Sequence, residues 1–308
     1  MAGNGNIDFF CLECYTDKSE VNTLQTEVIK IDRENMDLDA LKRAGEILKS
    51  GGLVAFPTET VYGLGGDGLH EESSRKIYEA KGRPSDNPLI VHVADMEHLE
   101  KIVKKVPKAA YKLAEAFWPG PMTMILEKND LVPYGTTGGL DTVAIRMPSD
   151  PIALELIRQG GGYIAAPSAN TSGRPSPTTA QHVYEDLQGK IPMILDGGAV
   201  TIGLESTIVD LTEEIPTILR PGFISLDMVQ AVLGEAQIDR GLIANDSNIH
   251  PKAPGMKYRH YAPKADLKIV EGPMEQVISY INEQAEKGRT GIICTEETRS
   301  RYPKGDIK

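Results

Sequence analysis

The sequence is poor in cysteine and contains no long hydrophobic segment. Its three cysteines, Cys11, Cys14 and Cys294, argue against a disulfide scaffold and are typical of a reducing compartment. No run approaches the roughly 20 apolar residues that cross a bilayer. The first ten residues also lack the positive charge of a secretory signal. We therefore expect a cytoplasmic protein that does not associate with a membrane.

Positive charge is also scarce, because 33 lysines and arginines face 44 aspartates and glutamates and the net charge is −11. A protein that holds a nucleic acid over its whole surface is usually basic, so such binding is not expected. The segment 247–265 is an exception, since it contains basic residues and no acidic one. It is either a solvated hinge or a strap that meets a phosphate-rich ligand.

Familiar nucleotide and metal motifs are absent as well. No G-x-x-x-x-G-K-[ST] segment occurs, which excludes a P-loop. Residues 63–68 formally match the dinucleotide fingerprint, but 57–62 separate them from the preceding strand. We interpret them as a glycine-rich turn that lets the backbone pack closely. Cys11 and Cys14 form a single C-x-x-C, which supplies too few ligands for a structural zinc site.

Short apolar runs alternate with amphipathic segments between residues 27 and 235. The predicted strands are 28–31, 53–56, 89–93, 122–126, 143–147, 163–166, 193–195, 207–211 and 217–219. The predicted helices are 38–48, 72–81, 96–105, 107–117, 151–158, 178–187 and 226–233. Buried strands interleave with helices, and some strands follow each other directly. We therefore predict an α/β domain with a twisted mixed sheet and flanking helices.

Three further parts complete the predicted domain organisation. We predict an N-terminal extension over 1–26, a linker over 236–265 and the start of a C-terminal α/β, Rossmann-like domain over 266–308. This last part contains a strand, a helix and a strand at 267–270, 274–286 and 291–294. One βαβ unit cannot bury its sheet alone, so the domain is expected to be truncated or to pack on the first.

Several polar residues lie next to predicted buried strands. Lys81, Arg83 and Asn87 precede one strand, where two cations suit a triphosphate clamp. A solvated basic helix end, favoured by the helix dipole, fits these residues equally well. Ser168 and Asn170 follow another strand, at an edge where open α/β sheets bind ligands. Ser168 and Asn170 are equally typical of a turn or a helix cap, so both interpretations stay open.

Two polar residues interrupt apolar strands. Arg146 lies within 143–147, and a buried charge is costly unless it is paired. We therefore expect that Arg146 meets either a carboxylate ligand or an internal partner. His92 lies within 89–93, where a histidine is more often a satisfied core residue than a ligand-binding one.

Taken together in their order and spacing, several segments resemble the YrdC-like family. They are Phe56–Gly65, Lys81–Pro84, Asn87–His92, Trp118–Pro121 with Thr123, Leu140–Arg146, Ala165–Asn170, Arg174–Pro177, Gly203–Ile208 and Leu219–Gly222. The segment Pro254–Pro263 is similar to the tether of the longer, two-domain threonylcarbamoyl-adenylate synthases, where it lies over the active site. Their second domain is longer than the part of this chain after Ala265.

The resemblance implies a role for each matching residue. The residues implied to hold L-threonine are Thr60, His92, Arg146, Ala166 and Ser206, and Arg146 would pair with its carboxylate. The residues implied to hold ATP are Arg83, Asn87, Thr142, Ser168, Ser176, Arg220 and Tyr261. Lys81 and Arg83 would lie at the phosphates as catalytic residues.

The resemblance also implies a reaction, in which L-threonine, bicarbonate and ATP give threonylcarbamoyl-AMP and pyrophosphate. Mg²⁺ is expected on the phosphates, and the product would pass to a tRNA threonylcarbamoyl-transferase machinery. Catalysis would come from positioning and charge neutralisation. One alternative is a non-catalytic RNA-binding module of the same fold, and direct contact with tRNA stays open. Another is a carbamoyl-transfer enzyme of hydrogenase maturation, which is expected to carry several zinc-type C-x-x-C repeats.

Overall fold

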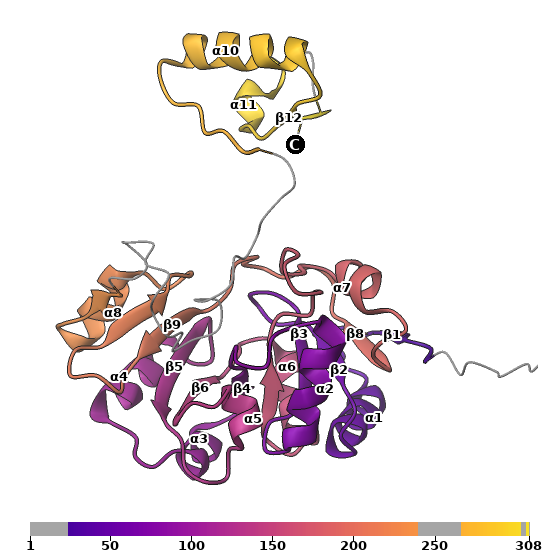
Figure 1. Ribbon diagram of the computed structural model, residues 1–308, viewed down its shortest axis with the longest axis vertical. Helices are drawn as coiled ribbons and strands as arrows, with labels where there is room; N and C mark the ends of the chain where they lie inside the picture. The colour runs from indigo at the N-terminus through magenta and orange to yellow at the C-terminus, as the bar shows by residue number, and fades with distance from the viewer. Residues whose placement is uncertain (1–23, 240–265, 303–305, 308) are drawn as a thin grey trace, which may run out of the picture. The chain divides into compact units, whose positions relative to one another are not determined.

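A computed structural model describes residues 24–239, 266–302 and 306–307 of the chain (Figure 1). Contacts between residues divide the chain into two compact units, Met1–Ala262 and Pro263–Lys308. Residues 1–23 of the predicted N-terminal extension and residues 240–265 of the predicted linker lie outside the described ranges. Within those ranges, no helix is both long and apolar enough to span a membrane.

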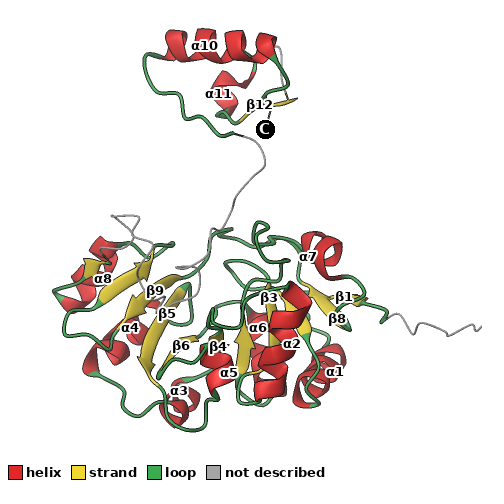
Figure 2. Ribbon diagram, in the orientation of Figure 1, coloured by secondary structure: helices red, strands yellow, loops and turns green. Residues whose placement is uncertain are grey.

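The first unit alternates strands and helices along most of its length (Figure 2). Its strands are β1 Glu27–Lys30, β2 Val54–Phe56, β3 Gly63–Asp67, β4 Ile90–His92, β5 Met122–Glu127, β6 Thr142–Arg146, β7 Ile164–Ala166, β8 Met193–Asp196, β9 Thr207–Asp210, β10 Thr217–Arg220 and β11 Gln237–Ile238. Its helices are α1 Leu38–Lys49, α2 Glu71–Lys81, α3 Met96–Ile102, α4 Lys108–Phe117, α5 Tyr134–Thr137, α6 Pro151–Gln159, α7 Ala180–Leu187 and α8 Leu226–Leu233.

Side-chain caps fix where several of these helices begin. The carboxylate of Asp37 accepts a hydrogen bond from a backbone N–H in the first turn of α1, and Asp150 does the same for α6. Thr179 and Ser225 cap α7 and α8 in the same way. Each cap satisfies a donor that has no partner within the helix. The predicted start of α1 after Asp37 is therefore confirmed.

The strands form one mixed sheet in the order β1-β8-β2-β3-β7-β4-β6-β5-β9-β10-β11. The pairs β1–β8, β2–β8, β4–β6, β5–β9 and β10–β11 are parallel. The pairs β2–β3, β3–β7, β4–β7, β5–β6 and β9–β10 are antiparallel. This arrangement confirms the predicted mixed sheet with flanking helices.

The two halves of the sheet are covered differently. Alternate residues of β2 belong to different core clusters, since Phe56 packs with α1 and α6 while Ala55 packs with α2 and α7. Helices therefore cover both faces of that half. In the other half, Val91 and Ile145 pack with α3, α4 and α8. Among the described residues, the opposite face, marked by Ile90, carries a small apolar cluster of strand residues and no helix of its own.

The glycine-rich segment corrects one prediction, because residues 63–67 form strand β3 and not a turn. A Cβ on Gly65 would lie 2.7 Å from Cγ2 of Ile164 and 3.0 Å from a ring carbon of Phe56. A Cβ on Gly66 would lie 3.1 Å from Cδ1 of Ile77. The glycines are therefore required by close packing of neighbouring strands and α2, and not by turn geometry.

The second unit contains α10 Met274–Lys287, β12 Gly291–Ile292, α11 Glu296–Arg299 and β13 Asp306–Ile307. Its helix agrees with the predicted helix 274–286, and β12 is shorter than the predicted strand 291–294. The predicted strand 267–270 is wrong, since no strand is assigned there and Leu267 and Ile269 are exposed. An apolar run forms a strand only where a partner strand pairs with it, and none pairs with this run among the described residues.

Candidate active site

A cavity of about 340 Å³ lies on the face of the sheet marked by Ile90, which no helix covers within the described part of the chain. Nine of the residues singled out from the sequence line it, namely Thr60, Arg83, His92, Arg146, Ala166, Ser168, Ser176, Ser206 and Arg220. The other lining residues are Thr58, Val61, Tyr62, Gly63, Ile90, Pro167, Glu205 and Pro221. Segments far apart in the sequence therefore meet at one cavity, and three arginines contribute positive charge to it.

Strand register brings His92 and Arg146 together. The parallel pairing of β4 with β6 places these two residues opposite each other at the carboxyl ends of the strands. Side chains two residues apart on a strand share a face, so His92 lies on the same face as Ile90. Arg146 likewise shares the face of Ala144, which belongs to the same small cluster as Ile90. Both polar side chains are thereby directed to the face marked by Ile90.

Arg146 has an internal partner, yet some of its donors lack an aligned hydrogen bond among the described residues. Its Nη2 lies 2.7 Å from Oε1 of Glu59, and its Nη1 donates a 2.9 Å hydrogen bond to Oγ1 of Thr60. Arg146 and Glu59 are both buried. Nevertheless, Nε and Nη2 of Arg146 and Oε1 of Glu59 have no well-aligned hydrogen bond among the described residues. The contact with Glu59 thus balances the charge of Arg146 and holds the guanidinium at the cavity without completing its hydrogen bonds.

His92 is a neutral imidazole at this position. Burial, together with the charge of Arg146, lowers the pKa of His92 to about 3. Its Nδ1 lies 3.1 Å from the carbonyl oxygen of Ile90, and its ring packs edge-on against Phe56. A neutral, fixed ring can shape the cavity and make hydrogen bonds there, but it adds no charge.

Arg220 connects the end of β10 to the residue that precedes β9. Its guanidinium donates to the backbone oxygen and to Oγ of Ser206, both at 3.1 Å. Oγ of Ser206 also lies 2.7 Å from Oγ1 of Thr123. Burial lowers the pKa of Arg220 to about 10, so it stays protonated at neutral pH. The guanidinium of Arg220 is therefore a second fixed positive charge at the cavity, and it is hydrogen-bonded to the hydroxyl of Ser206.

Lys81 supports the cavity wall and does not line the cavity. Its ammonium donates to the backbone oxygens of Ser168 and Asn170, and Lys81 is buried. Desolvation lowers its pKa well below the usual value. Oγ of Ser168 donates to Oδ1 of Asn170, whose amide donates to the backbone oxygen of Arg174. Lys81 thus fixes the turn that presents Ser168, and its predicted contact with phosphate stays a prediction.

The remaining singled-out residues lie around the cavity or outside the described ranges. Arg83 is held by the carbonyl oxygens of Asn87 and Pro88 at 3.2 and 3.1 Å. Asn87 is buried and Thr142 begins β6, and neither lines the cavity. Tyr261 lies outside the described residues.

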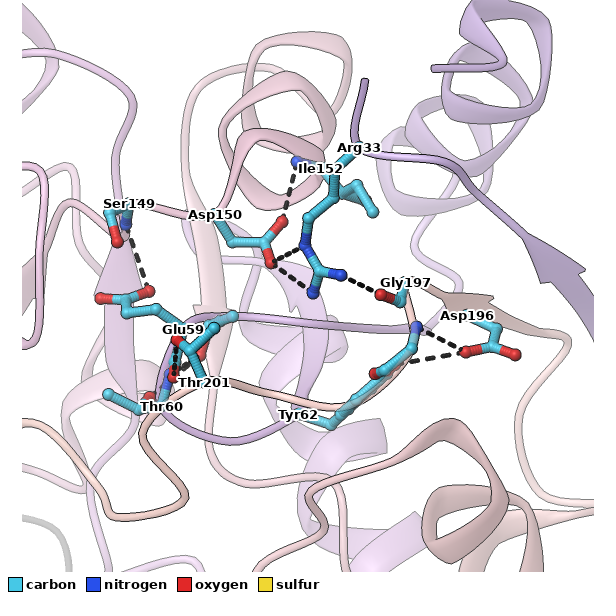
Figure 3. Close-up of polar contacts among 12 residues, drawn as sticks. Arg33, Glu59, Thr60, Tyr62, Ser149, Asp150, Ile152, Asp196, Gly197 and Thr201 are labelled. Atoms are coloured by element: carbon cyan, nitrogen blue, oxygen red, sulfur yellow. Dashed lines mark hydrogen bonds and ion pairs between the residues drawn. The ribbon is translucent and has the colours of Figure 1, made fainter. Parts of the chain in front are cut away.

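Two carboxylates at the site were not singled out from the sequence. Glu205 lines the cavity and accepts a hydrogen bond from Ser176. Glu59 lies beside Arg146, and its backbone belongs to the loop shown in Figure 3. The expected internal partner of Arg146 was the available signal for Glu59, but a sequence pattern does not identify which carboxylate supplies it. The described residues contain no group of three or more His, Cys, Asp or Glu side chains arranged to hold a metal ion.

Two family models match this chain. The Sua5–YciO–YrdC family model, described as "Telomere recombination", matches residues 46–222. A second model, described as "Threonylcarbamoyl-AMP synthase, C-terminal domain", matches residues 224–307.

Two curated relatives are named threonylcarbamoyl-AMP synthase. The protein from Pyrococcus abyssi is 52% identical over 266 residues, covering 85% of this chain and 78% of that protein. The protein from Bacillus subtilis is 50% identical over 270 residues, covering 87% of this chain and 78% of its own length.

Solved structures are also similar to this chain. The crystal structure of P. abyssi Sua5 complexed with L-threonine superposes with a TM-score of 0.85 at 47% identity, covering 92% of this chain and 83% of that one. E. coli YciO, at 24% identity and a TM-score of 0.59, shares the fold. With a family model over more than half of the chain and a matched C-terminal domain, this chain belongs to the two-domain branch of the Sua5–YciO–YrdC family.

Proposed function

We propose that this protein is an L-threonylcarbamoyladenylate synthase, which forms threonylcarbamoyl-AMP and pyrophosphate from L-threonine, bicarbonate and ATP. The observation that carries the proposal is one cavity lined by the buried Arg146 together with two half-buried arginines and several hydroxyl groups. The names of the relatives from P. abyssi and B. subtilis support it, as does the complex of P. abyssi Sua5 with L-threonine.

The amino acid would occupy the buried side of the cavity. Its carboxylate would pair with the guanidinium of Arg146, which lines the cavity, because the planar guanidinium matches a carboxylate in bidentate fashion. Thr60, His92 and Ser206 would provide hydrogen-bonding groups, and Ala166 would leave room for the side chain. All five residues are buried, which makes charged contacts there stronger than in water.

ATP would occupy the more open side. Arg83 and Arg220 would meet the phosphates, and the hydroxyls of Ser168 and Ser176 would provide further hydrogen bonds. The inferred ATP residues that do not line the described cavity are Asn87, Thr142 and Tyr261. Lys81 would contribute by holding the Ser168 turn.

The chemistry requires little from side-chain nucleophiles. The neutral amine of L-threonine attacks carbon dioxide derived from bicarbonate and gives a carbamate. A carbamate oxygen then attacks the α-phosphorus of ATP in line, and pyrophosphate leaves with the electron pair of the broken P–O bond. Placing both substrates in one cavity converts a bimolecular step into an effectively unimolecular one. Fixed cations stabilise the charge on the phosphates.

Mg²⁺ would arrive with ATP. It usually keeps several waters and takes only one or two protein carboxylates beside the phosphate oxygens. Glu205, as a cavity-lining carboxylate, fits that limited role. The ion would neutralise phosphate charge. We further propose that the protein works in the cytoplasm and passes its product to a tRNA threonylcarbamoyl-transferase.

Pyrophosphate release tests the proposal. Purified protein is incubated with ATP, bicarbonate and each of several amino acids, and pyrophosphate is measured. Release should require bicarbonate and should be fastest with L-threonine. Release that is independent of both the amino acid and bicarbonate would contradict the proposal. Salt-dependent tRNA binding without any release would favour the RNA-binding alternative.

A further inference from the structure

Glu59 occupies an unusual place behind the cavity. It is 8% exposed and does not line the cavity, and its Oε1 lies 2.7 Å from Nη2 of Arg146. Its Oε2 accepts a 3.2 Å hydrogen bond from the backbone N–H of Ser149 (Figure 3). The carboxylate is therefore held from one side by the chain that follows β6 and faces the guanidinium from the other.

The backbone around Glu59 also holds a wall of the cavity. The carbonyl oxygen of Glu59 accepts from Oγ1 of Thr201 and from the N–H of Ile202. The carbonyl oxygen of Thr60 accepts from the N–H of Gly203. Figure 3 shows the loop that carries Glu59 and Thr60 beside the segment that carries Thr201. Because the segment leads directly to the cavity-lining Glu205, one loop connects the arginine with this wall.

The pair of Glu59 and Arg146 is balanced in charge but incomplete in hydrogen bonds. A buried ion pair contributes to stability only when its remaining donors and acceptors are satisfied. Here Nε and Nη2 of Arg146 and Oε1 of Glu59 lack aligned partners within the described part of the chain. These atoms are also inaccessible to solvent, so the contact between Glu59 and Arg146 acts from behind the cavity that Arg146 lines.

We propose that Glu59 is a positioning residue for the amino-acid carboxylate. It sets the orientation of Arg146 through Oε1 while Thr60 accepts from Nη1, so that the guanidinium is held in place at the cavity, which Arg146 lines, before the ligand arrives. Such preorganisation lowers the cost of ordering a long side chain upon binding. The inference rests on the proposed function, since it assumes that the ligand of Arg146 is an amino acid.

The test compares L-threonine with L-threoninamide, which lacks the carboxylate. Glu59→Gln keeps the size of the side chain and can still accept the hydrogen bond from Ser149. Calorimetry should show L-threonine binding weakened at least about tenfold, the loss expected for a displaced charged hydrogen bond. Binding of L-threoninamide and of ATP should change less than about twofold, because neither carries a carboxylate that pairs with Arg146.

A double-mutant cycle then shows whether Glu59 acts through Arg146. Once Arg146→Met has removed the guanidinium, adding Glu59→Gln should cost little further affinity for L-threonine. Asp150→Asn is the matched control, because Asp150 is another buried carboxylate paired with an arginine, Arg33, at 2.9 Å. That variant should lose stability without losing the preference for the carboxylate.

Results other than these would contradict either the proposed function or the role of Glu59. If the unmodified protein does not bind L-threonine, the proposed function is wrong. If it binds L-threonine but Glu59→Gln keeps the preference over L-threoninamide, or if the two losses in the cycle add fully, Glu59 is no positioning residue.

Discussion

The residues inferred to hold the amino acid and those inferred to hold ATP are positioned in different ways. The five residues inferred to hold the amino acid are all buried, and two of them, His92 and Arg146, face each other on paired strands. Of the described residues inferred to hold ATP, all except Asn87 are half-buried, and most lie in loops or at strand ends. Strand register thus brings the first set close together, whereas the second set lies mostly in loops, where a larger ligand would extend toward solvent.

Removing Arg146 should separate the two sides most clearly. We expect Arg146→Ala to weaken L-threonine binding at least about 100-fold, because a carboxylate loses its bidentate partner inside a buried site. ATP affinity should change less than about threefold. Calorimetry with each ligand measures both. Arg75→Ala is the control, since Arg75 is exposed and pairs only with residues of its own helix. Unchanged L-threonine affinity would contradict the role of Arg146.

Replacing Arg83 should instead affect ATP binding. We expect Arg83→Met to weaken ATP binding about tenfold or more, because a guanidinium held by the carbonyl oxygens of Asn87 and Pro88 is lost from the phosphate side. L-threonine binding should stay within about twofold. Titration of each ligand, with Arg75→Met as the control, measures the split. A larger loss for L-threonine than for ATP would reverse our assignment of the two sides.

Lys81 should have a smaller effect, because it acts through the backbone. Lys81→Met leaves the carbonyl oxygens of Ser168 and Asn170 without their donor, which should lower the unfolding free energy by about 2 kcal/mol. The displaced Ser168 should weaken ATP binding about fivefold. Urea unfolding and calorimetry measure the two effects. A loss of ATP affinity as large as that of Arg83→Met, with unchanged stability, would instead indicate direct contact with phosphate.

Protonation of His92 should have the smallest effect on ligand binding, because the ring stays neutral over the pH range in which the protein is assayed. Its pKa is about 3 in the folded protein and near 6.5 when unfolded, so the unfolded state binds more protons between these values. This contribution to stability is complete above pH 6.5 and falls below it, by at most about 1.4 kcal/mol per pH unit. L-threonine affinity should be flat between pH 7.5 and 5.5. The NMR signals of the His92 ring measure its protonation, and a midpoint near pH 6.5 would contradict the buried, neutral ring.

The sequence predicts the order of helices and strands well and the contacts between distant residues poorly. Apolar runs and caps such as Asp37 are local signals, and most predicted helices and strands are confirmed. Strand β3 was not predicted, because its glycines serve packing against Phe56 and Ile164, which no local pattern reveals. The cost of burying Arg146 indicated a partner, but only the folded chain identifies Glu59. The contact of the Lys81 side chain with the backbone oxygens of Ser168 and Asn170 likewise depends on how the turn at 168–170 folds.

The most direct test of the account is to identify the nucleotide product. Protein, ATP, L-threonine and ¹³C-labelled bicarbonate are mixed, and the nucleotides are separated and analysed by mass spectrometry. We predict an adenylate that contains L-threonine and carries the ¹³C label, formed in step with pyrophosphate. An unlabelled threonyl-adenylate, or only ADP and phosphate, would contradict the claim that this one cavity joins an amino-acid carbamate to the α-phosphate of ATP.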